Sequence, residues 1–192
     1  MRIHAIHGFN VRDRGEGTVL ALAAHLLPLI RHPQPIQLIP CGFGFRFLVR
    51  VRLGTRRRAR EIASRIRPGD IVIAHSDGCN IADLAAQALP ASHKITLIYV
   101  NPALNRTMPL APSVRRCLVY SCPTDLPVRL ARWLPLHRWG DMGAFGPARP
   151  DPRYISIPYA ALGLAPQGHS GVFRHSHPRL TVALDIARRL RS

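Results

Sequence analysis

A serine on a sharp turn is the residue of this chain whose surroundings best fit chemistry. Ser76 lies in Ile71-Val-Ile-Ala-His-Ser-Asp-Gly-Cys79, where an apolar run leads into a serine flanked by the small residues Ala74 and Gly78. Residues 80–89 follow with helical spacing. A serine between a strand and a helix is held with its hydroxyl exposed, as a nucleophile requires. The pattern therefore predicts a nucleophile; the alternative role is a helix N-cap.

A serine needs a base and an acid to become nucleophilic. The predicted acid is Asp125, which closely follows the apolar run 115–121. Asp141 follows the same run at a greater distance and is the reserve candidate, and Asp151 also lies downstream. The chain has only ten carboxylates, so the choice is narrow.

The predicted base is His169, in the segment Gln167-Gly-His-Ser-Gly171 after the apolar run 154–158. His175 and His177 are nearby competitors, and their place at the start of a helical pattern favours surface or capping roles. Serine, acid and histidine thus arrive in that order along the chain.

The elements that must position these groups alternate between strand and helix. Six apolar runs read as strands, at residues 2–6, 35–40, 70–74, 94–100, 115–121 and 154–158. Helical patterns lie between them, at residues 16–31, 55–67 (capped by Thr55), 80–89, 126–134 and 178–190, while residues 140–151 read as a loop. This alternation predicts one α/β domain over residues 1–192, a three-layer α/β/α sandwich around a mostly parallel sheet of about six strands. The carboxyl ends of its strands form the edge where ligands bind.

These motifs together resemble the α/β-hydrolase superfamily, over essentially the whole chain and as a small, lidless, esterase- or lipase-like member. The order Ser, Asp, His is that of the superfamily. His7-Gly8 resembles its oxyanion loop, and the segment around His169 resembles its histidine loop. The chain departs from the pattern at Ala74, which stands where the elbow usually has glycine. The resemblance also implies a fold without the first two strands of the full superfamily fold.

The resemblance implies a set of roles. Ser76, His169 and Asp125 would be nucleophile, base and acid. The backbone N–H of Asp77 and that of Phe9, with Asn10 as second choice, would form the oxyanion hole.

Several neighbouring polar residues are interpreted as structural. The Asp77 side chain is expected to face solvent or an arginine. His7 is expected to bond the loop beneath the oxyanion hole, and His75 to pack against the turn. His4 is interpreted as a core histidine and Cys79 as a small buried residue. No spacing of histidines, cysteines and carboxylates fits a metal, and neither a metal nor a cofactor is expected.

The formal net charge is +17, and arginine supplies all of the 27 basic residues except Lys94. This skew is typical of a GC-rich coding sequence, and it favours a solvated face or attraction to anionic surfaces over dedicated nucleic-acid binding. The arginines are densest between Arg46 and Arg60. The Phe- and Arg-rich segment 43–53 is open to two interpretations, a surface connection or an edge of a substrate, membrane or nucleic-acid site.

No apolar run reaches the roughly 18 residues that a membrane span needs, and no signal peptide is evident. The four cysteines lack disulfide or metal spacing, so reduced thiols in a cytoplasm are expected.

The sequence therefore predicts a serine hydrolase of a carboxylic ester or thioester, which works through an acyl-enzyme on a small and possibly anionic substrate. Two alternatives remain. One is an idle hydrolase fold that binds nucleic acid or another anionic partner. The other is an amidase or peptidase with the same triad.

Overall fold

A computed structural model places six strands in one sheet, with the order β2-β1-β3-β4-β5-β6 and parallel pairing throughout. The structure describes residues 1–8, 15–30, 37–40, 54–131, 133 and 139–191. The strands are β1 (Arg2–Ile6), β2 (Gln37–Pro40), β3 (Ile71–His75), β4 (Ile95–Val100), β5 (Val114–Ser121) and β6 (Tyr154–Pro158). All six were predicted, within one or two residues at each end.

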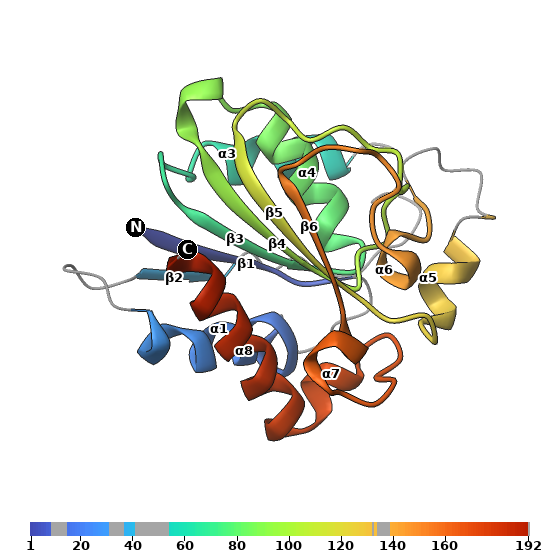
Figure 1. Cartoon of the computed structure of the whole chain (residues 1–192). Helices are drawn as coiled ribbons and strands as arrows, with labels where there is room; N and C mark the ends of the chain where they lie inside the picture. The colour runs from blue at the N-terminus through green and yellow to red at the C-terminus, as the bar shows by residue number, and fades with distance from the viewer. Residues whose placement is uncertain (9–14, 31–36, 41–53, 132, 134–138, 192) are drawn as a thin grey trace.

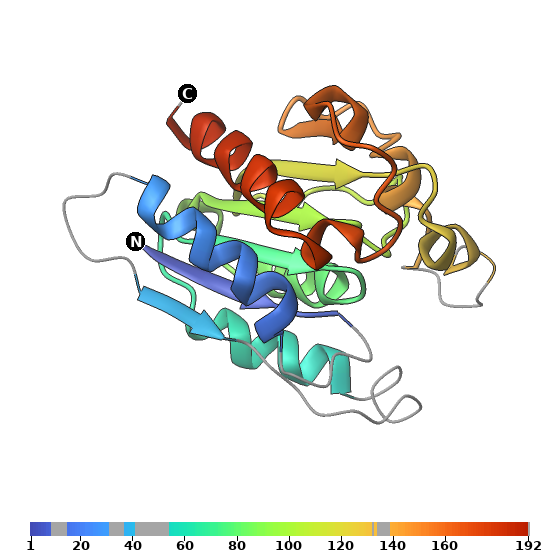
Figure 2. The same cartoon turned by 90° about the horizontal axis from the view of Figure 1, so that it is seen from below.

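Helices cover both faces of the sheet, as Figures 1 and 2 show. The pair α3 (Thr55–Ala63) and α4 (Gly78–Gln87) packs on one face, and the pair α1 (Ala21–Leu26) and α8 (Ser176–Arg191) packs on the other. Strands β3 and β4 are buried along their whole length, because apolar layers press on both sides of them. The predicted three-layer α/β/α architecture is confirmed.

Three short helices lie beyond the carboxyl ends of the last strands: α5 (Leu126–Ala131), α6 (Met142–Phe145) and α7 (Gly171–Arg174). The sequence predicted a loop where α6 forms. Tertiary contacts hold this turn of helix, since Gly143 N donates to Pro102 O and Gly143 O accepts from Cys122 N, each at 2.8 Å. The segment after β5 is thereby fixed to the segment after β4.

The helix predicted over residues 16–31 is not continuous. A π-helical turn spans Glu16–Leu20 and is broken at Thr18 (φ −124°, ψ −105°), α1 follows, and a 3-10 turn at Leu27–Leu29 ends the segment. Pro28 fits that last turn because its missing N–H is not needed at the start of a helical turn. The prediction that Thr55 caps α3 was wrong, since Gly54 occupies the capping position.

The expectation of a core histidine at His4 is confirmed, because His4 is fully buried and hydrogen-bonded at the base of the sheet. Asp70, just before β3, accepts from His4 Nε2 at 2.9 Å, from Arg2 N at 2.7 Å and from Arg67 N at 2.9 Å. These bonds keep the pKa of Asp70 below its usual value, although burial alone would raise it. No helix in the described ranges is long and apolar enough to cross a membrane.

Candidate active site

Ser76 occupies a tight turn between β3 and α4. Its φ of +56° is in the left-handed region, which costs a non-glycine residue roughly 1–2 kcal/mol. Two glycines make the turn possible. A Cβ on Gly78 would lie 2.6 Å from His7 O, and one on Gly8 would lie 2.7 Å from Ser76 Cβ. The N-cap of α4 is Asp77, so the alternative of Ser76 as a plain N-cap is wrong.

The structure brings Ser76, His169 and Asp125 together from three loops at the carboxyl edge of the sheet. Ser76 Oγ lies 2.9 Å from His169 Nε2. His169 Nδ1 lies 2.9 and 3.0 Å from the two oxygens of Asp125, whose side chain is fully buried. With Nδ1–H donated to the carboxylate, Nε2 is left to accept the serine proton. This is the connectivity that a serine nucleophile requires.

The competing candidates lie elsewhere. Asp151 is paired with Arg153 at 2.8 Å, and Asp141 stands at the start of α6. His175 and His177 are exposed where α7 ends and α8 begins.

Further bonds fix the carboxylate of Asp125. Its Oδ1 accepts from Val128 N at 3.1 Å in the first turn of α5, and its Oδ2 accepts from Asn101 Nδ2 at 2.8 Å. Both oxygens therefore hold a second donor in addition to His169, and the carboxylate cannot rotate without losing one of them.

Sequence reasoning missed Asn101 and its partner Tyr159. Asn101 is fully buried with φ +47°, and its Oδ1 accepts from Tyr159 Oη at 2.6 Å. Burial raises the pKa of Tyr159 well above its usual value, so the phenol stays protonated and can donate. The only available signal was position: Asn101 directly follows β4, at the same edge as the other site loops.

His75 contacts His169 directly, beyond the packing role predicted for it. Its Nε2–H donates to His169 O at 3.0 Å, and the two rings lie 4.8 Å apart. Phe173 meets the other edge of the His75 ring at 4.9 Å. Burial, with a smaller effect from His169, lowers the pKa of His75 to about 3. A neutral His75 therefore supports the backbone of His169 throughout the physiological range.

This shift predicts acid sensitivity. Below pH 6.5 the unfolded chain protonates His75 while the folded chain does not until about pH 3, so stability falls as pH drops through that window. We expect His75→Phe to reduce this fall by about 1.4 kcal/mol per pH unit, the slope for one proton. Urea unfolding between about pH 7 and pH 4 measures it. The control His177→Phe, at an exposed site, should retain the wild-type slope. An identical slope in His75→Phe would contradict the assignment.

The three residues predicted for the oxyanion hole are only partly described. Asp77 directly follows Ser76 at the amino end of α4, as an oxyanion donor must. Phe9 and Asn10 lie outside the described residues. Of the two alternatives expected for the Asp77 side chain, solvent is wrong, because the residue is 7 % exposed, and an arginine partner stays a prediction. The close fit of α4 against the loop after β1, seen at Gly78, explains the burial.

The remaining predictions around the site concern structural residues. His7 is buried and donates from Nδ1 to Gly8 O at 2.7 Å, as expected for a residue that braces the first loop. Cys79 is a buried free thiol, and burial raises its pKa well above the usual value. Among the described residues, no group of histidines, cysteines and carboxylates could hold a metal ion.

The dense arginine cluster is described only from Gly54 onward. On α3 the side chains of Arg56, Arg57, Arg58 and Arg60 are exposed, and Arg58 pairs with Glu61 at 2.9 Å. This part of the cluster is a solvated helix face. The segment 43–53 lies outside the described residues, and nucleic-acid binding stays untested.

The chain was compared with family models, curated proteins and solved structures. No family model matches the chain, and no curated protein matches it. Among solved structures, the chain is similar to the crystal structure of the esterase domain from a Rhodothermus marinus protein. The TM-score is 0.51 and the sequence identity 13 %, over 99 % of this chain and 85 % of that one. At this identity the likeness concerns the fold alone, and the parallel sheet flanked by helices is consistent with a minimal α/β-hydrolase-like fold.

Proposed function

We propose that the protein is a serine hydrolase of a carboxylic ester or thioester, with Ser76 as nucleophile, His169 as base and Asp125 as acid. The observation that carries the proposal is the hydrogen-bonded chain Ser76 Oγ, His169 Nε2, His169 Nδ1 and Asp125, built on a turn whose φ is unfavourable for serine. Backbone strain at a polar residue in such a chain is typical of a functional site. The fold shared with an esterase domain supports the same class of reaction.

The proposed roles lead to the following reaction. His169 Nε2 takes the proton of Ser76 Oγ as that oxygen bonds to the substrate carbonyl carbon. The backbone N–H of Asp77, with that of Phe9 or Asn10, stabilises the oxyanion. The tetrahedral intermediate collapses, the bond to the leaving oxygen or sulfur breaks, and His169 returns the proton to that group. Water then attacks the acyl-enzyme by the same route and releases the acid.

A leaving amine needs a proton more than a leaving alkoxide or thiolate does. Because His169 could supply that proton, the same triad also admits amidase or peptidase activity. The rate on a p-nitrophenyl ester compared with the matching p-nitroanilide separates these reactions.

Labelling with a fluorophosphonate tests the proposal directly, because the reagent reacts with activated serines. We expect one adduct per chain, located by peptide mass spectrometry on Ser76, which is only 8 % exposed. The exposed serines Ser64 and Ser92 should remain unlabelled, since exposure alone does not activate a hydroxyl. Protein that is unfolded before the reagent is added should form no adduct. A folded protein that takes no label, or takes it at an exposed serine, would contradict the proposal and favour a binding role.

A further inference from the structure

Helix α5 turns an apolar stripe away from the core. Val128 is its buried residue, whereas Leu126, Leu130 and Trp133 are 57, 56 and 74 % exposed. Leu126 and Leu130 are four positions apart and so lie on one side of α5, and Trp133 lies in a turn after the helix, where its N donates to Leu130 O at 3.0 Å. Phe145, at the end of α6, is 44 % exposed beside them. Four of the six large exposed apolar residues in the described ranges gather here, on α5, just after it and at the end of α6.

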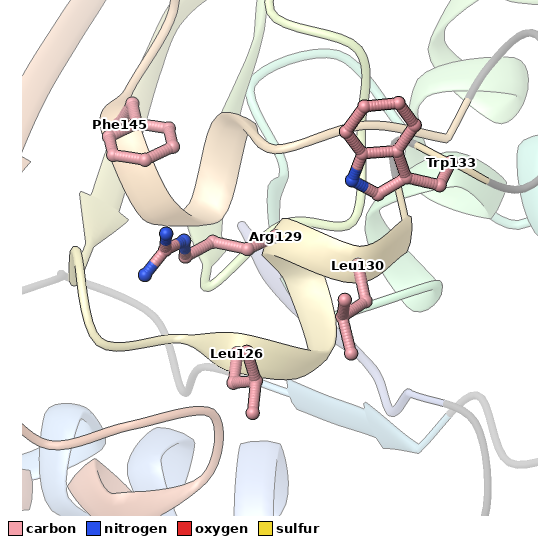
Figure 3. Close-up of a pocket in the computed structure, with 5 residues that line it drawn as sticks. All are labelled: Leu126, Arg129, Leu130, Trp133 and Phe145. Atoms are coloured by element: carbon pink, nitrogen blue, oxygen red, sulfur yellow. The ribbon is translucent and has the colours of Figure 1, made fainter.

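Two arginines lie within the same surface. The guanidinium carbon of Arg129 is 6.0 Å from the centre of the Phe145 ring, and that of Arg106 is 5.6 Å from it. Figure 3 shows Arg129 reaching from α5 toward Phe145, with Leu126 and Leu130 on the same helix and Trp133 beyond its end. Arg106 donates to Gly146 O at 2.8 Å and to Phe145 O at 3.3 Å, and within the described part of the chain no carboxylate pairs with Arg129. Leu126, Arg129, Leu130, Trp133 and Phe145 line a shallow hollow of about 220 Å³, which we call the α5 surface.

We propose that the α5 surface binds the surface of an anionic phospholipid membrane. Leucine, tryptophan and phenylalanine beside arginine is the combination that enters the boundary between headgroups and acyl chains. Tryptophan favours that boundary, and arginine keeps its charge at the phosphates while its stem covers apolar atoms. The net charge of +17 attracts the whole molecule to an anionic bilayer.

Other occupants fit the surface less well. Two-fold pairing with a second copy would bring Arg129 and Arg106 of both chains together, between molecules that each carry +17. Nucleic acid would satisfy the arginines but leave the two leucines without apolar contact. An anionic phospholipid offers phosphates to the arginines and acyl chains to the leucines.

The α5 surface starts next to the proposed active site, because Leu126 directly follows Asp125. Binding there would bring the carboxyl edge of the sheet close to the membrane. The inference concerns binding alone, so it stands or falls independently of whether Ser76 is a nucleophile.

Vesicle flotation tests the proposal with the full chain. We compare vesicles of phosphatidylcholine alone with vesicles in which about a third of the lipid is phosphatidylglycerol, an anionic fraction that generates the required surface potential. We expect binding to the anionic vesicles only, weakened at high salt as the charges are screened. In a Trp139→Phe background, Trp133 is the one tryptophan, and its emission should shift to the blue on binding.

Matched variants separate this surface from general basic attraction. The pair Leu126→Ser and Leu130→Ser should lower the affinity at least tenfold, since the roughly 1.5 kcal/mol or more of burying one leucine already exceeds tenfold. Arg129→Gln should lower it about fivefold, the effect of about 1 kcal/mol per charge. The control pair Leu180→Ser and Leu184→Ser has the same spacing and similar exposure on α8, and it should bind like wild type.

Leu130→Ser alone, more distant from Asp125, provides a second variant in case the pair does not fold. Three results would each overturn the proposal: equal binding to neutral vesicles, unchanged Trp133 emission, or control leucines that matter as much as those of α5. Concentration-dependent dimerisation that the α5 variants abolish would instead assign the surface to a second copy.

Discussion

Ser76→Ala is expected to lower kcat/KM on a short-chain p-nitrophenyl ester by about 10⁴- to 10⁶-fold, the range found when a triad nucleophile is removed. The hydroxyl held 2.9 Å from His169 Nε2 is the atom that would form the acyl-enzyme, and alanine offers no substitute. A small residual rate should remain, since the oxyanion donors and the binding surface are unchanged. Initial rates at substrate concentrations well below KM measure the effect.

Stability provides an internal control for this variant. Alanine keeps the unfavourable φ of +56°, so the thermal midpoint should stay close to that of wild type. Ser76→Gly should be equally inactive but more stable by about 1 kcal/mol, because glycine adopts positive φ without strain. Ser92→Ala, at an exposed serine, should retain full activity. If Ser76→Ala keeps more than a tenth of the wild-type rate, Ser76 is not the nucleophile.

The sequence predicts the fold and the site residues for one physical reason. Strands buried on both faces must be apolar along their length, as β3 and β4 are, and such runs stand out in a sequence. Once the strands are located, the shared carboxyl edge brings the residues after them together. Ser76, Asp125 and His169 could therefore be placed near one another although up to 93 residues separate them.

What the sequence did not predict depends on contacts between distant residues. Nothing near Asn101 predicts that its amide joins Asp125 to Tyr159, a residue 58 positions later. The ring contact between His75 and His169 likewise requires the loop before α7 to fold over the end of β3. The same holds for Asp77, which is polar but buried because α4 fits closely against the first loop. Local patterns predict elements, whereas these details arise from how the elements meet.

Asp125→Asn is expected to lower kcat/KM by about 10⁴-fold while leaving the shape of the site intact. The carboxylate accepts from His169 Nδ1, Asn101 Nδ2 and Val128 N. An asparagine amide has one acceptor oxygen, and its NH₂ group must face one of these donors. Val128 and Asn101 donate to different oxygens of Asp125, so the amide oxygen keeps one of these donors and the NH₂ group takes the place of the other oxygen. His169 Nδ1 lies within reach of both positions, and where it faces the NH₂ group it becomes the acceptor. The proton then sits on Nε2, which can no longer take the proton of Ser76.

The other acids after β5 provide matched controls. Asp141→Asn, at the start of α6, and Asp151→Asn, which weakens the pair with Arg153, should each keep activity within a few-fold of wild type. Asp125→Asn should still take the fluorophosphonate label, only more slowly, because Ser76 and the oxyanion donors remain in place. Loss of activity in Asp141→Asn with retention in Asp125→Asn would transfer the acid to the other loop. Equal rates in all three variants would mean that no carboxylate orients His169, and the buried bonds of Asp125 would then serve only to join α5 to the strand ends.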